Sequence, residues 1–340
     1  MEKQFKVAVV GATGLVGHEM ITILEERGFP VSELLPLASP RSAGQKIRFG
    51  GKELTVEVAS EERFEGVDIA LFSAGGETSK ILAPAAAKAG AVVIDNSSQW
   101  RMTEGVPLVV PEVNSEDIGG YREKGIIANP NCSTIQMVVA LAPLHREAGL
   151  QRVVVSTYQA VSGAGKSGMD ELSSQVSSLF NQLDFEPKNF SKQIAFNCIP
   201  HIDVFQEDGF TKEEHKMVFE TRKILNLPDL PICATCVRVP VFNGHAESVL
   251  AEFESEVSAE RATAILRESP GLFVQDSPKD NLYPVQIEVS GSDATCVGRI
   301  RKDPSSDRGI TFWCVADNLR KGAATNAVQI AEILARDHLS

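Results

Sequence analysis

Cys132 stands in a sequence context that suits a nucleophilic thiol. It lies in the segment Asn129–Thr134 (NPNCST), between an expected strand and an expected helix, so the thiol falls near a helix N-terminus. The helix dipole and the backbone N–H groups there stabilise a thiolate and depress its pKa. Such a thiolate can carry an acyl group as a thioester. A single cysteine is more often a small buried apolar residue, so this assignment depends on the surrounding motifs.

Three glycines follow the first apolar strand at regular spacing. Gly11, Gly14 and Gly17 occur in the run GATGLVG, which opens a helical pattern. A glycine turn lets the backbone approach phosphate groups, and the helix N-terminus adds amide donors. The spacing departs from the commoner G-x-G-x-x-G, and a plain tight turn is the alternative. The residues expected at a dinucleotide cofactor are Gly11, Thr13, Gly14, Leu15, Val16 and Gly17.

The residues after the second expected strand bear on the choice of cofactor. A cofactor with a free ribose 2′-hydroxyl normally meets an Asp or Glu about twenty residues after the glycine turn. The corresponding stretch, 37–44, reads LASPRSAG and offers Arg41 and Ser42 in place of an acid. A cation and hydroxyls suit a 2′-phosphate, which predicts NADP(H). The alternative is that Arg41 is a solvated loop charge.

The first part of the chain has the pattern of a parallel sheet covered by helices. From Phe5 to about Ile127, short β-rich runs alternate with helical patterns, which is typical of a Rossmann-type domain. The expected strands are Lys6–Val10, Leu34–Ala38, Asp68–Phe72, Ala91–Ile94, Leu108–Val110 and Gly125–Ala128. The expected helices are Gly14–Arg27 and Glu77–Ala89, the second ending before Gly90.

After residue 132 the pattern changes to strands in which apolar and polar residues alternate, as in a half-buried antiparallel sheet. The expected strands are Val153–Gln159, Ala234–Val241, Ala246–Glu254, Val285–Val289 and Ile310–Val315. The expected helices are Ser133–Glu147, Ser167–Leu183 and Leu319–Arg336. The fold class is therefore α/β, with a cofactor domain over residues 1–131, a mixed α/β domain over residues 132–317, and the last helix, residues 318–340, returning to the first domain.

Composition excludes several classes of protein. The chain has 340 residues, of which 43% are hydrophobic, so two domains with real cores are expected. A formal net charge of −12 disfavours nucleic acid and anionic membranes as partners. The N-terminus begins with a strand, and no apolar run reaches the ~18 residues of a membrane span, so a cytoplasmic protein is expected. Six cysteines are too few for a disulfide framework in a chain of this length.

Four segments together resemble the aspartate-β-semialdehyde dehydrogenase family. They are the glycine turn, Asn129–Thr134, Gln159–Gly165 (QAVSGAG), and Arg238–Val241 (RVPV) with the following Gly244-His245. The resemblance runs over the whole chain. It implies NADPH-dependent reductive dephosphorylation of L-4-aspartyl phosphate to L-aspartate 4-semialdehyde, a reversible step in lysine, threonine and methionine biosynthesis. It also implies a catalytic and dimerisation domain like that of glyceraldehyde-3-phosphate dehydrogenase, in a homodimer or a dimer of dimers.

The resemblance assigns roles to three residues at the reacting carbonyl. It implies that Cys132 is the nucleophile, that His245 is the general acid/base, and that Gln159 orients the substrate beside the thiol. An imidazole can exchange protons near neutral pH, and an amide can donate hydrogen bonds without competing for the proton. Outside this context, a histidine after a glycine is more often an ordinary surface or capping residue.

The proposed substrate carries a carboxylate, an ammonium and a phosphoryl group, so its pocket needs one acid among several bases. By resemblance, Arg238 binds the carboxylate through its guanidinium fork, and Glu220 pairs with the ammonium. The implied phosphate ligands are Lys223, Arg101 and Asn131. Two ordinary alternatives remain for these residues: Glu220 and Lys223 could form an i,i+3 surface pair, and Arg101 could stack on Trp100.

For the cofactor, the resemblance adds Ser162 and Gly163 near the nicotinamide side and Asn318 at the start of the final helix. Glycine at position 163 would give the backbone room to approach the ring. Asn318 could equally be an N-cap of that helix.

Other functions remain as alternatives. N-acetyl-γ-glutamyl-phosphate reductase runs the same thioester chemistry, but its substrate has no ammonium and so no use for Glu220. Glyceraldehyde-3-phosphate dehydrogenase is less similar, because its cysteine motif differs. A catalytically silent NADP-binding homologue is a further alternative. The pair Cys233 and Cys236 has the spacing of half a zinc site or a dithiol, but no second pair accompanies it, so packing cysteines and no metal are expected.

Overall fold

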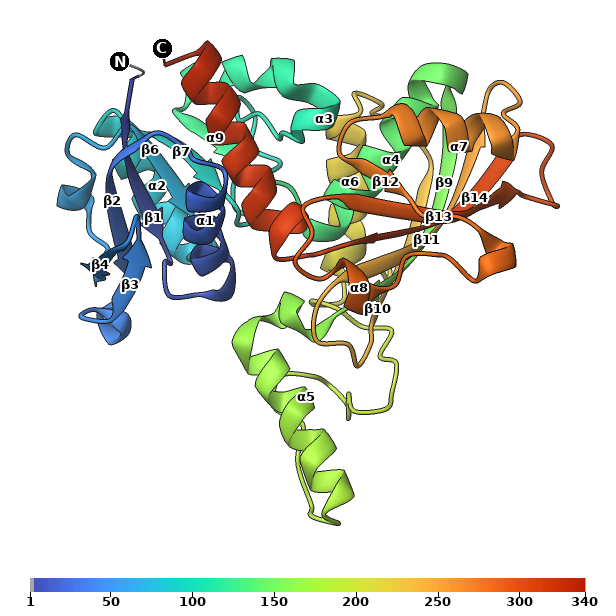
Figure 1. Cartoon of the computed structure of the whole chain (residues 1–340), viewed down its shortest axis with the longest axis horizontal. Coiled ribbons are helices and arrows are strands. Elements are labelled where there is room, and N and C mark those ends of the chain that lie inside the picture. Colours follow the sequence, from blue (N-terminus) through green and yellow to red (C-terminus); the bar gives the residue numbers. More distant parts are fainter. Residues whose placement is uncertain (1–2, 340) are drawn as a thin grey trace. The chain divides into compact units, whose positions relative to one another are not determined.

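The computed structural model describes residues 3–339, which form two compact units. The first unit comprises Met1–Asn131 and Ala323–Ser340, and the second comprises Cys132–Gly322. Each unit contains its own six-stranded sheet (Figure 1). Among the described residues, every helix is too short or too polar to cross a membrane.

The sheet of the first unit is parallel, with strand order β5-β2-β1-β6-β7-β8. Its strands are β1 (Phe5–Val10), β2 (Val31–Ala38), β5 (Glu57–Val58), β6 (Ile69–Phe72), β7 (Val92–Asp95) and β8 (Ile126–Ala128), and β3 (Lys46–Phe49) and β4 (Lys52–Thr55) form a separate hairpin. The order matches that of dinucleotide-binding sheets. The α/β fold class with a Rossmann-type first domain is therefore confirmed.

The helices of the first unit bury the sheet. They are α1 (Leu15–Glu26), α2 (Gly76–Lys88), the short α3 (Pro111–Asn114) and α9 (Thr325–Asp337). Residues of α1 and α9 pack into one apolar core with β1, β6 and β7. Figure 1 shows α9, from the far end of the chain, beside α1. Residues 7–10 of β1 are completely buried, as expected of a strand covered on both faces.

The sheet of the second unit is mixed, with strand order β10-β9-β11-β14-β13-β12. Its strands are β9 (Leu150–Gln159), β10 (Ile232–Arg238), β11 (His245–Phe253), β12 (Leu272–Val274), β13 (Thr295–Lys302) and β14 (Gly309–Ala316). Its helices are α4 (Cys132–Ala148), α5 (Gly165–Phe180), α6 (Lys212–Ile224), α7 (Ala259–Glu268) and α8 (Gln286–Val289). The central strands β9, β11 and β14 pair antiparallel, and β13 pairs antiparallel with β14. The edge strands β10 and β12 pair parallel with β9 and β13.

Alternation along these strands separates a covered face from an open one. On β9, Val153, Val155, Thr157 and Gln159 are buried, whereas Val154, Ser156 and Tyr158 are half exposed. Helices α4, α6 and α7 pack on the sheet. Helix α4 is buried almost all round, from Ser133 to Leu144, because it lies between the sheet and neighbouring helices. The covered face therefore carries the site described below.

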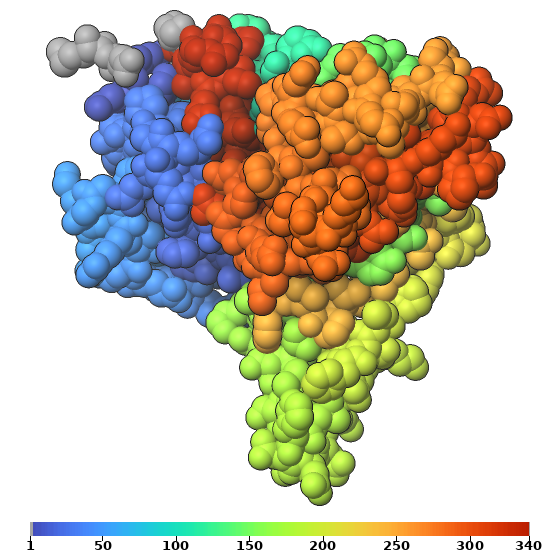
Figure 2. Space-filling model, turned by 45° about the vertical axis from the view of Figure 1, so that its right-hand side comes forward, coloured from blue at the N-terminus to red at the C-terminus, as the bar shows by residue number. Residues whose placement is uncertain are grey.

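Helix α5 and the following segment form an arm that projects from the second unit. Figure 2 shows the arm, residues 165–200, as a narrow lobe in green and yellow-green. The arm has a small apolar cluster of its own, around Leu172 and Ile194. Phe180, Leu183 and Phe196 remain exposed at 75%, 61% and 68%, which is unusual for large apolar side chains in one place.

Three expectations about elements were wrong or too broad. Val285–Val289 is not a strand, because Gln286–Val289 form the one-turn helix α8. Its apolar alternation is misleading, since Ile287 is 82% exposed and the Gln286 amide is bound to the carbonyls of Tyr158 and Gly244. Leu108–Val110 contributes only an isolated bridge to Ala128. The final helix begins as a π-helical turn, Arg320–Ala324, before α9.

Candidate active site

Cys132 is the first residue of α4, directly after the loop that leaves β8. The first turn of α4 contains no acidic residue, so nothing in that turn offsets the positive end of the helix dipole. The side chain is half-buried. The backbone of Gly322 lies close to it, because a β-carbon on Gly322 would be 3.0 Å from the Cys132 Cβ. The position, half-buried at the start of a helix, is suited to a stabilised thiolate.

His245 opens β11 and is completely buried. Its Nδ1 accepts a hydrogen bond from the Ala160 N–H at 3.1 Å, so the neutral ring carries its proton on Nε2. Nε2 has no hydrogen-bond partner among the described residues. Burial and, next, the positive charge of Arg238 lower the pKa of His245 to about 3, against smaller opposing effects of Glu213 and of a backbone hydrogen bond at Gly244. The resting imidazole is therefore a neutral N–H donor.

Arg238 ends β10 and is buried beside the same backbone segment. Its Nη1 donates to the Ala160 carbonyl at 2.7 Å. A β-carbon on Gly163 would be 2.8 Å from Nη1 and 3.2 Å from His245 Nε2, so all three groups meet at one point. Burial lowers the pKa of Arg238, while Glu213, Cys132 and Cys236 favour the charged form. The backbone of Ala160 thus bonds both side chains: its N–H donates to His245, and its carbonyl accepts from Arg238.

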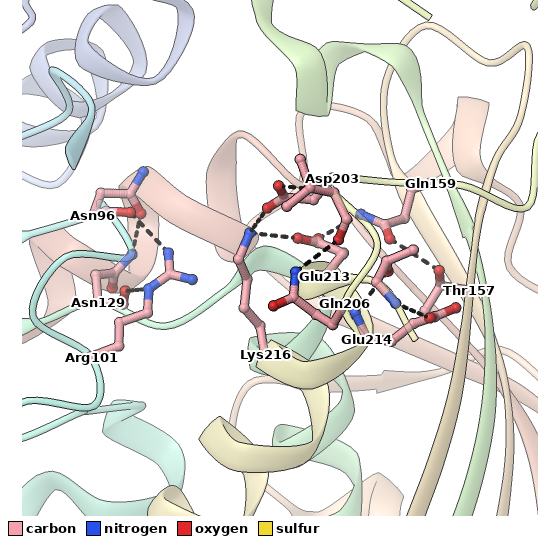
Figure 3. A network of polar contacts seen from close by, with 12 residues as sticks. Asn96, Arg101, Asn129, Thr157, Gln159, Asp203, Gln206, Glu213, Glu214 and Lys216 are labelled. Atoms are coloured by element: carbon pink, nitrogen blue, oxygen red, sulfur yellow. Dashed lines mark hydrogen bonds and ion pairs between the residues drawn. The ribbon is translucent and has the colours of Figure 1, made fainter. Parts of the chain in front are cut away.

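Gln159 lies in register with Arg238 on the adjacent strand and is buried. The Thr157 hydroxyl donates to Gln159 Oε1 at 3.0 Å. Gln159 Nε2 donates to Glu213 Oε1 at 3.2 Å (Figure 3). Cys132, Gln159, Arg238 and His245, which were predicted to act together, all belong to the second unit.

Glu213 and Lys216 belong to this site although the sequence analysis did not include them. Helix α6 starts with a capping box in which Thr211 and Glu214 bond each other's backbone N–H groups. Glu213, in the first turn, then forms an ion pair with Lys216 at 2.9 Å, and Lys216 also binds Asp203 at 2.8 Å. Figure 3 shows Lys216 between these two carboxylates.

Four of the charged residues of helix α6 lie along one face, which we call the charged face of α6. Glu213, Lys216, Glu220 and Lys223 follow one another at intervals of three, four and three residues, which is the period of one helical stripe. Glu220 is 1% exposed and Glu213 is 6% exposed. A surface pair of Glu220 and Lys223 is therefore excluded as an explanation. The spacing, together with the capping box, is the sequence signal that would have found Glu213 and Lys216.

Ser162 and Asn318 interact directly with each other next to His245. Asn318 Nδ2 donates to Ser162 Oγ at 2.9 Å, and Asn318 Oδ1 accepts from the Gly244 N–H at 2.9 Å. Asn318 is not the N-cap of the final helix. Asp317 accepts from the N–H groups of Leu319 and Arg320 instead. Asn318 therefore fixes the residue before His245.

Arg101 and Asn131 belong to the first unit, and both are buried. Arg101 Nε donates to the Asn129 carbonyl at 2.9 Å, and Nη2 donates to the Asn96 carbonyl at 2.9 Å. These bonds hold the guanidinium between two loops at the carboxyl ends of β7 and β8 (Figure 3). The backbone contacts determine how the guanidinium is oriented.

The glycine turn of the first unit has the geometry of a close backbone approach. Gly11 has φ +87°, and a β-carbon there would be 2.4 Å from the Ser73 carbonyl oxygen. A β-carbon on Gly17 would be 2.1 Å from the Gly11 carbonyl oxygen. These two glycines are required by the turn itself. Gly14 is the N-cap of α1, and no side chain caps the first amides of this helix. A phosphate fits such a helix start.

Arg41 and Ser42 lie in a short 3-10 helix, Pro40–Ser42, directly after β2. Strand β2 pairs in parallel with β1, and the Leu37 carbonyl accepts from the N–H groups of Gly11 and Ala12. The segment after β2 therefore runs beside the glycine turn. Arg41 is exposed there.

Cys233 and Cys236 do not form a joint site. They lie three residues apart on β10, so their side chains point to opposite faces of the sheet. Cys233 is exposed and Cys236 is buried, and burial raises the pKa of Cys236. Across residues 3–339, no group of three or more His, Cys, Asp or Glu side chains could hold a metal ion. All six cysteines lie in this range, and none forms a disulfide.

Comparison with known proteins gives the same family over the whole length. Residues 6–121 match the model "Semialdehyde dehydrogenase, NAD binding domain", and residues 141–321 match "Semialdehyde dehydrogenase, dimerisation domain". An aspartate-semialdehyde dehydrogenase of Aquifex aeolicus is 57% identical over 337 residues, covering 98% of this chain and 99% of the relative. One from Bacillus subtilis is 53% identical, with complete coverage of both chains.

Solved structures show the same similarity. Aspartate semialdehyde dehydrogenase II of Vibrio cholerae, described both alone and "complexed with ASA", has a TM-score of 0.97 and 53% identity. It covers 99% of this chain and 100% of its own. An aspartate semialdehyde dehydrogenase of Candida albicans "with NADP" has a TM-score of 0.73 and 26% identity, covering 98% of each chain.

Proposed function

The chain belongs to the aspartate-semialdehyde dehydrogenase family, and we propose that it reduces L-4-aspartyl phosphate to L-aspartate 4-semialdehyde with NADPH, reversibly, through a thioester on Cys132. The observation that carries the mechanism is the meeting of Arg238 and His245 at the backbone of Ala160 and Gly163. That arrangement supports a carboxylate-binding role for Arg238 and a donor role for His245, in the unit that also contains Cys132.

The thiolate of Cys132 attacks the acyl carbon of the substrate, and a carbon–sulfur bond forms. The carbonyl oxygen takes the negative charge, and phosphate then leaves with the electrons of the broken carbon–oxygen bond. NADPH, when bound, supplies a hydride to the thioester carbon. Collapse of the resulting oxyanion releases the aldehyde and regenerates the thiolate, so no net proton transfer to the thiol is required.

His245 is proposed to act at the oxygen of this carbonyl. That oxygen becomes negative twice in the reaction, once in each addition step. A neutral imidazole that holds its proton on Nε2 can donate a hydrogen bond to the oxygen both times. This donor role needs no change of protonation, and it refines the acid/base role expected from the family resemblance.

We propose that the site selects its substrate by the charges that the substrate carries. Arg238 would bind the α-carboxylate, and its buried fork suits two parallel hydrogen bonds. Glu220, which is buried on the charged face of α6, would pair with the ammonium. Gln159 would orient the acyl group. The residues proposed for the phosphoryl group are Lys223, Arg101 and Asn131.

The first unit is proposed to bind NADP through residues 1–131 and the last helix. Gly11, Gly14 and Gly17 bring the start of α1 close to the pyrophosphate, and Arg41 with Ser42 would bind the 2′-phosphate. The remaining contacts proposed at the turn are Thr13, Leu15 and Val16. In the second unit, Ser162, Gly163 and Asn318 are proposed to receive the nicotinamide.

We propose a homodimer, or a dimer of dimers, with a second copy of the chain on the open sheet face of the second unit. The matched model of residues 141–321 is a dimerisation domain. Half-exposed Tyr158 and Trp313 lie in contact on that face, and the arm carries exposed Phe180. The reaction would serve lysine, threonine and methionine synthesis in the cytoplasm, as the family resemblance implies.

The test of this function supplies aspartate semialdehyde, phosphate and either NADP or NAD, and follows the absorbance of the reduced cofactor. Rapid phosphate-dependent reduction of NADP is expected. Reduction that does not depend on phosphate, or none with either cofactor, would rule out the proposal. Each relative described above carries the same enzyme name, and none is named as an N-acetyl-γ-glutamyl-phosphate reductase.

A further inference from the structure

Asp317 is a buried carboxylate that has no role in the reaction as proposed so far. It directly follows β14 and is 2% exposed. Its Oδ1 accepts from the N–H groups of Leu319 and Arg320 at 2.8 and 3.2 Å. Its Oδ2 accepts from the Gly291 N–H and from Asn243 Nδ2, both at 2.7 Å. The carboxylate is therefore bonded to three backbone donors and one side-chain amide.

The Asn243 amide can face only one way beside this carboxylate. An ionised carboxylate accepts hydrogen bonds and donates none, so the NH2 group of Asn243 must point toward Asp317. The same NH2 group donates to Ser290 Oγ at 2.8 Å. Asn243 Oδ1 is thereby turned toward Ser162, whose hydroxyl donates to it at 3.1 Å. The orientation of the Asn243 amide thus determines where the Ser162 proton lies.

The Ser162 hydroxyl also contacts the Asn318 amide. Asn318 Oδ1 accepts from the Gly244 N–H at 2.9 Å, and Asn318 Nδ2 donates to Ser162 Oγ at 2.9 Å. Asn318 Oδ1 lies 3.1 Å from Ser162 Oγ as well, but it already accepts the backbone N–H, so Asn243 Oδ1 is the better acceptor for the proton. A hydroxyl has one proton and two lone pairs. With its proton on Asn243 and one lone pair bonded to Asn318, Ser162 keeps one lone pair.

We propose that Asn243 and Asp317 are positioning residues that make Ser162 a hydrogen-bond acceptor for the nicotinamide carboxamide. The carboxamide offers an NH2 group and a carbonyl oxygen, and only the NH2 group can donate to the remaining lone pair. Ser162 is 2% exposed, so this acceptor is buried. The inference rests on the proposed place of the nicotinamide beside Ser162. It goes beyond that proposal because it assigns a function to two side chains that need not touch the cofactor.

The test compares the binding of NADP with that of its 3-acetylpyridine analogue, in which a methyl group replaces the carboxamide NH2 group. Isothermal titration calorimetry of the full-length protein without substrate gives both dissociation constants. We expect the wild type to bind NADP about fivefold more tightly than the analogue, which is the effect of one hydrogen bond between neutral groups. Asn243→Leu removes the acceptor of the Ser162 proton, so the hydroxyl can turn. The preference for NADP should then fall below about twofold, as it should in Ser162→Ala.

Ser290→Ala is the matched control. It removes one contact of the same Asn243 NH2 group but leaves the bond to Asp317 that orients the amide, so the wild-type preference for NADP should persist. The double variant Ser162→Ala/Asn243→Leu should show the same preference as Ser162→Ala, because Asn243 acts only through the hydroxyl. Asp317→Asn carries the test if Asn243→Leu does not fold. An asparagine there can present its oxygen or its NH2 group, so the Asn243 amide can turn and the preference should again fall.

Two results would overturn the inference: equal binding of NADP and the analogue by the wild type, or the wild-type preference in the folded Asn243→Leu and Asp317→Asn variants. A further loss of preference in the double variant would also overturn it, since Asn243 would then act on the cofactor by another route. Failure of the wild type to bind either nucleotide would instead refute the proposed cofactor, and the inference with it.

Discussion

The backbone of Gly163 lies against the guanidinium of Arg238, so closely that a β-carbon on Gly163 would be 2.8 Å from Nη1. The same β-carbon would be 3.2 Å from the imidazole of His245. The glycine is therefore required by the two functional side chains and not by its own backbone, since its φ is not in the left-handed region. A side chain at position 163 would therefore disturb both Arg238, the proposed carboxylate ligand, and His245, the proposed oxyanion donor.

Gly163→Ala should displace Arg238 and His245 while the fold persists. We expect kcat/KM for aspartate semialdehyde to fall about 100-fold, because a shift of about 1 Å at reacting groups has effects of this size. Stability should fall by about 1–3 kcal/mol from the added methyl group. Steady-state kinetics and urea unfolding measure the two effects. Gly120→Ala is the control, because its β-carbon would make ordinary contacts with Pro107 at 3.7 Å. Unchanged kinetics for Gly163→Ala would show that the two side chains are not at the reacting centre.

Arg238→Lys should weaken substrate binding while the nucleophile stays intact. A lysine ammonium cannot form two parallel bonds to a carboxylate, and it cannot reproduce the fork that also bonds the Ala160 carbonyl. We expect KM for aspartate semialdehyde to rise at least about tenfold, the loss of one charge-assisted hydrogen bond. Arg222→Lys, at a residue whose Nε donates to the Leu230 carbonyl at 2.8 Å, is the matched control. An unchanged KM would remove Arg238 from the carboxylate site.

The buried carboxyl of Glu247 should make the free energy of unfolding depend on pH. It is completely buried on β11, and burial raises its pKa well above the usual range, with the Gln136 amide opposing only in part. The carboxyl is thus neutral in the folded chain but ionises in the unfolded chain near its ordinary pKa. Rising pH therefore favours the unfolded state, and the contribution of this group to stability, present at low pH, is lost as pH rises above about 4.5.

Glu247→Gln removes this linkage. We expect the variant to gain stability over wild type as pH rises from about 5 to about 8, by up to about 1.4 kcal/mol per pH unit. Urea unfolding across that range measures the gain. Glu252→Gln on the same strand is the control, because it makes the same chemical change at a surface residue that pairs with Arg152 at 3.3 Å. A constant difference between wild type and Glu247→Gln at all pH values would mean that Glu247 is ionised in the folded protein.

Arg41→Ala should affect NADP and NAD differently. If Arg41 binds the 2′-phosphate, its loss should raise KM for NADP about tenfold and leave KM for NAD unchanged, since NAD has no such group. Arg48→Ala, which removes an exposed arginine from the β3–β4 hairpin, controls for net charge. Equal changes for both cofactors would identify Arg41 as a solvated loop charge.

The sequence predicts the nucleotide-binding half of the fold well because its signals are local. The glycine turn, the buried strands and the position of Cys132 between a strand and a helix can all be recognised in short segments. The segment Val285–Val289 was predicted to be a strand, and its local pattern could not have predicted the helical turn that it forms. Its three apolar residues alternate as in a strand, but the long-range bonds of Gln286 to the carbonyls of Tyr158 and Gly244 hold the segment as one helical turn.

The residue types of the site could be predicted from the sequence, but the hydrogen bonds that hold them together could not. Residue type and motif indicate Cys132, Gln159, Arg238 and His245. That the Ala160 backbone binds both Arg238 and His245 depends on three strands meeting, which no local pattern contains. Glu213 was missed for a different reason: an acid in the first turn of a helix is usually a solvated partner of the helix dipole. In the sequence only its spacing along α6 and the capping box distinguish it, and in the structure it is buried.

The most direct test of the mechanism is mass spectrometry of the enzyme after rapid acid quenching during turnover with aspartate semialdehyde, phosphate and NADP. Acid slows hydrolysis of a thioester, so the acyl group should be found on the peptide that contains Cys132 and should be absent from Cys132→Ala, which is expected to bind NADPH but not to turn over. An active enzyme that shows no adduct on Cys132, or a Cys132→Ala variant with wild-type turnover, would contradict the account.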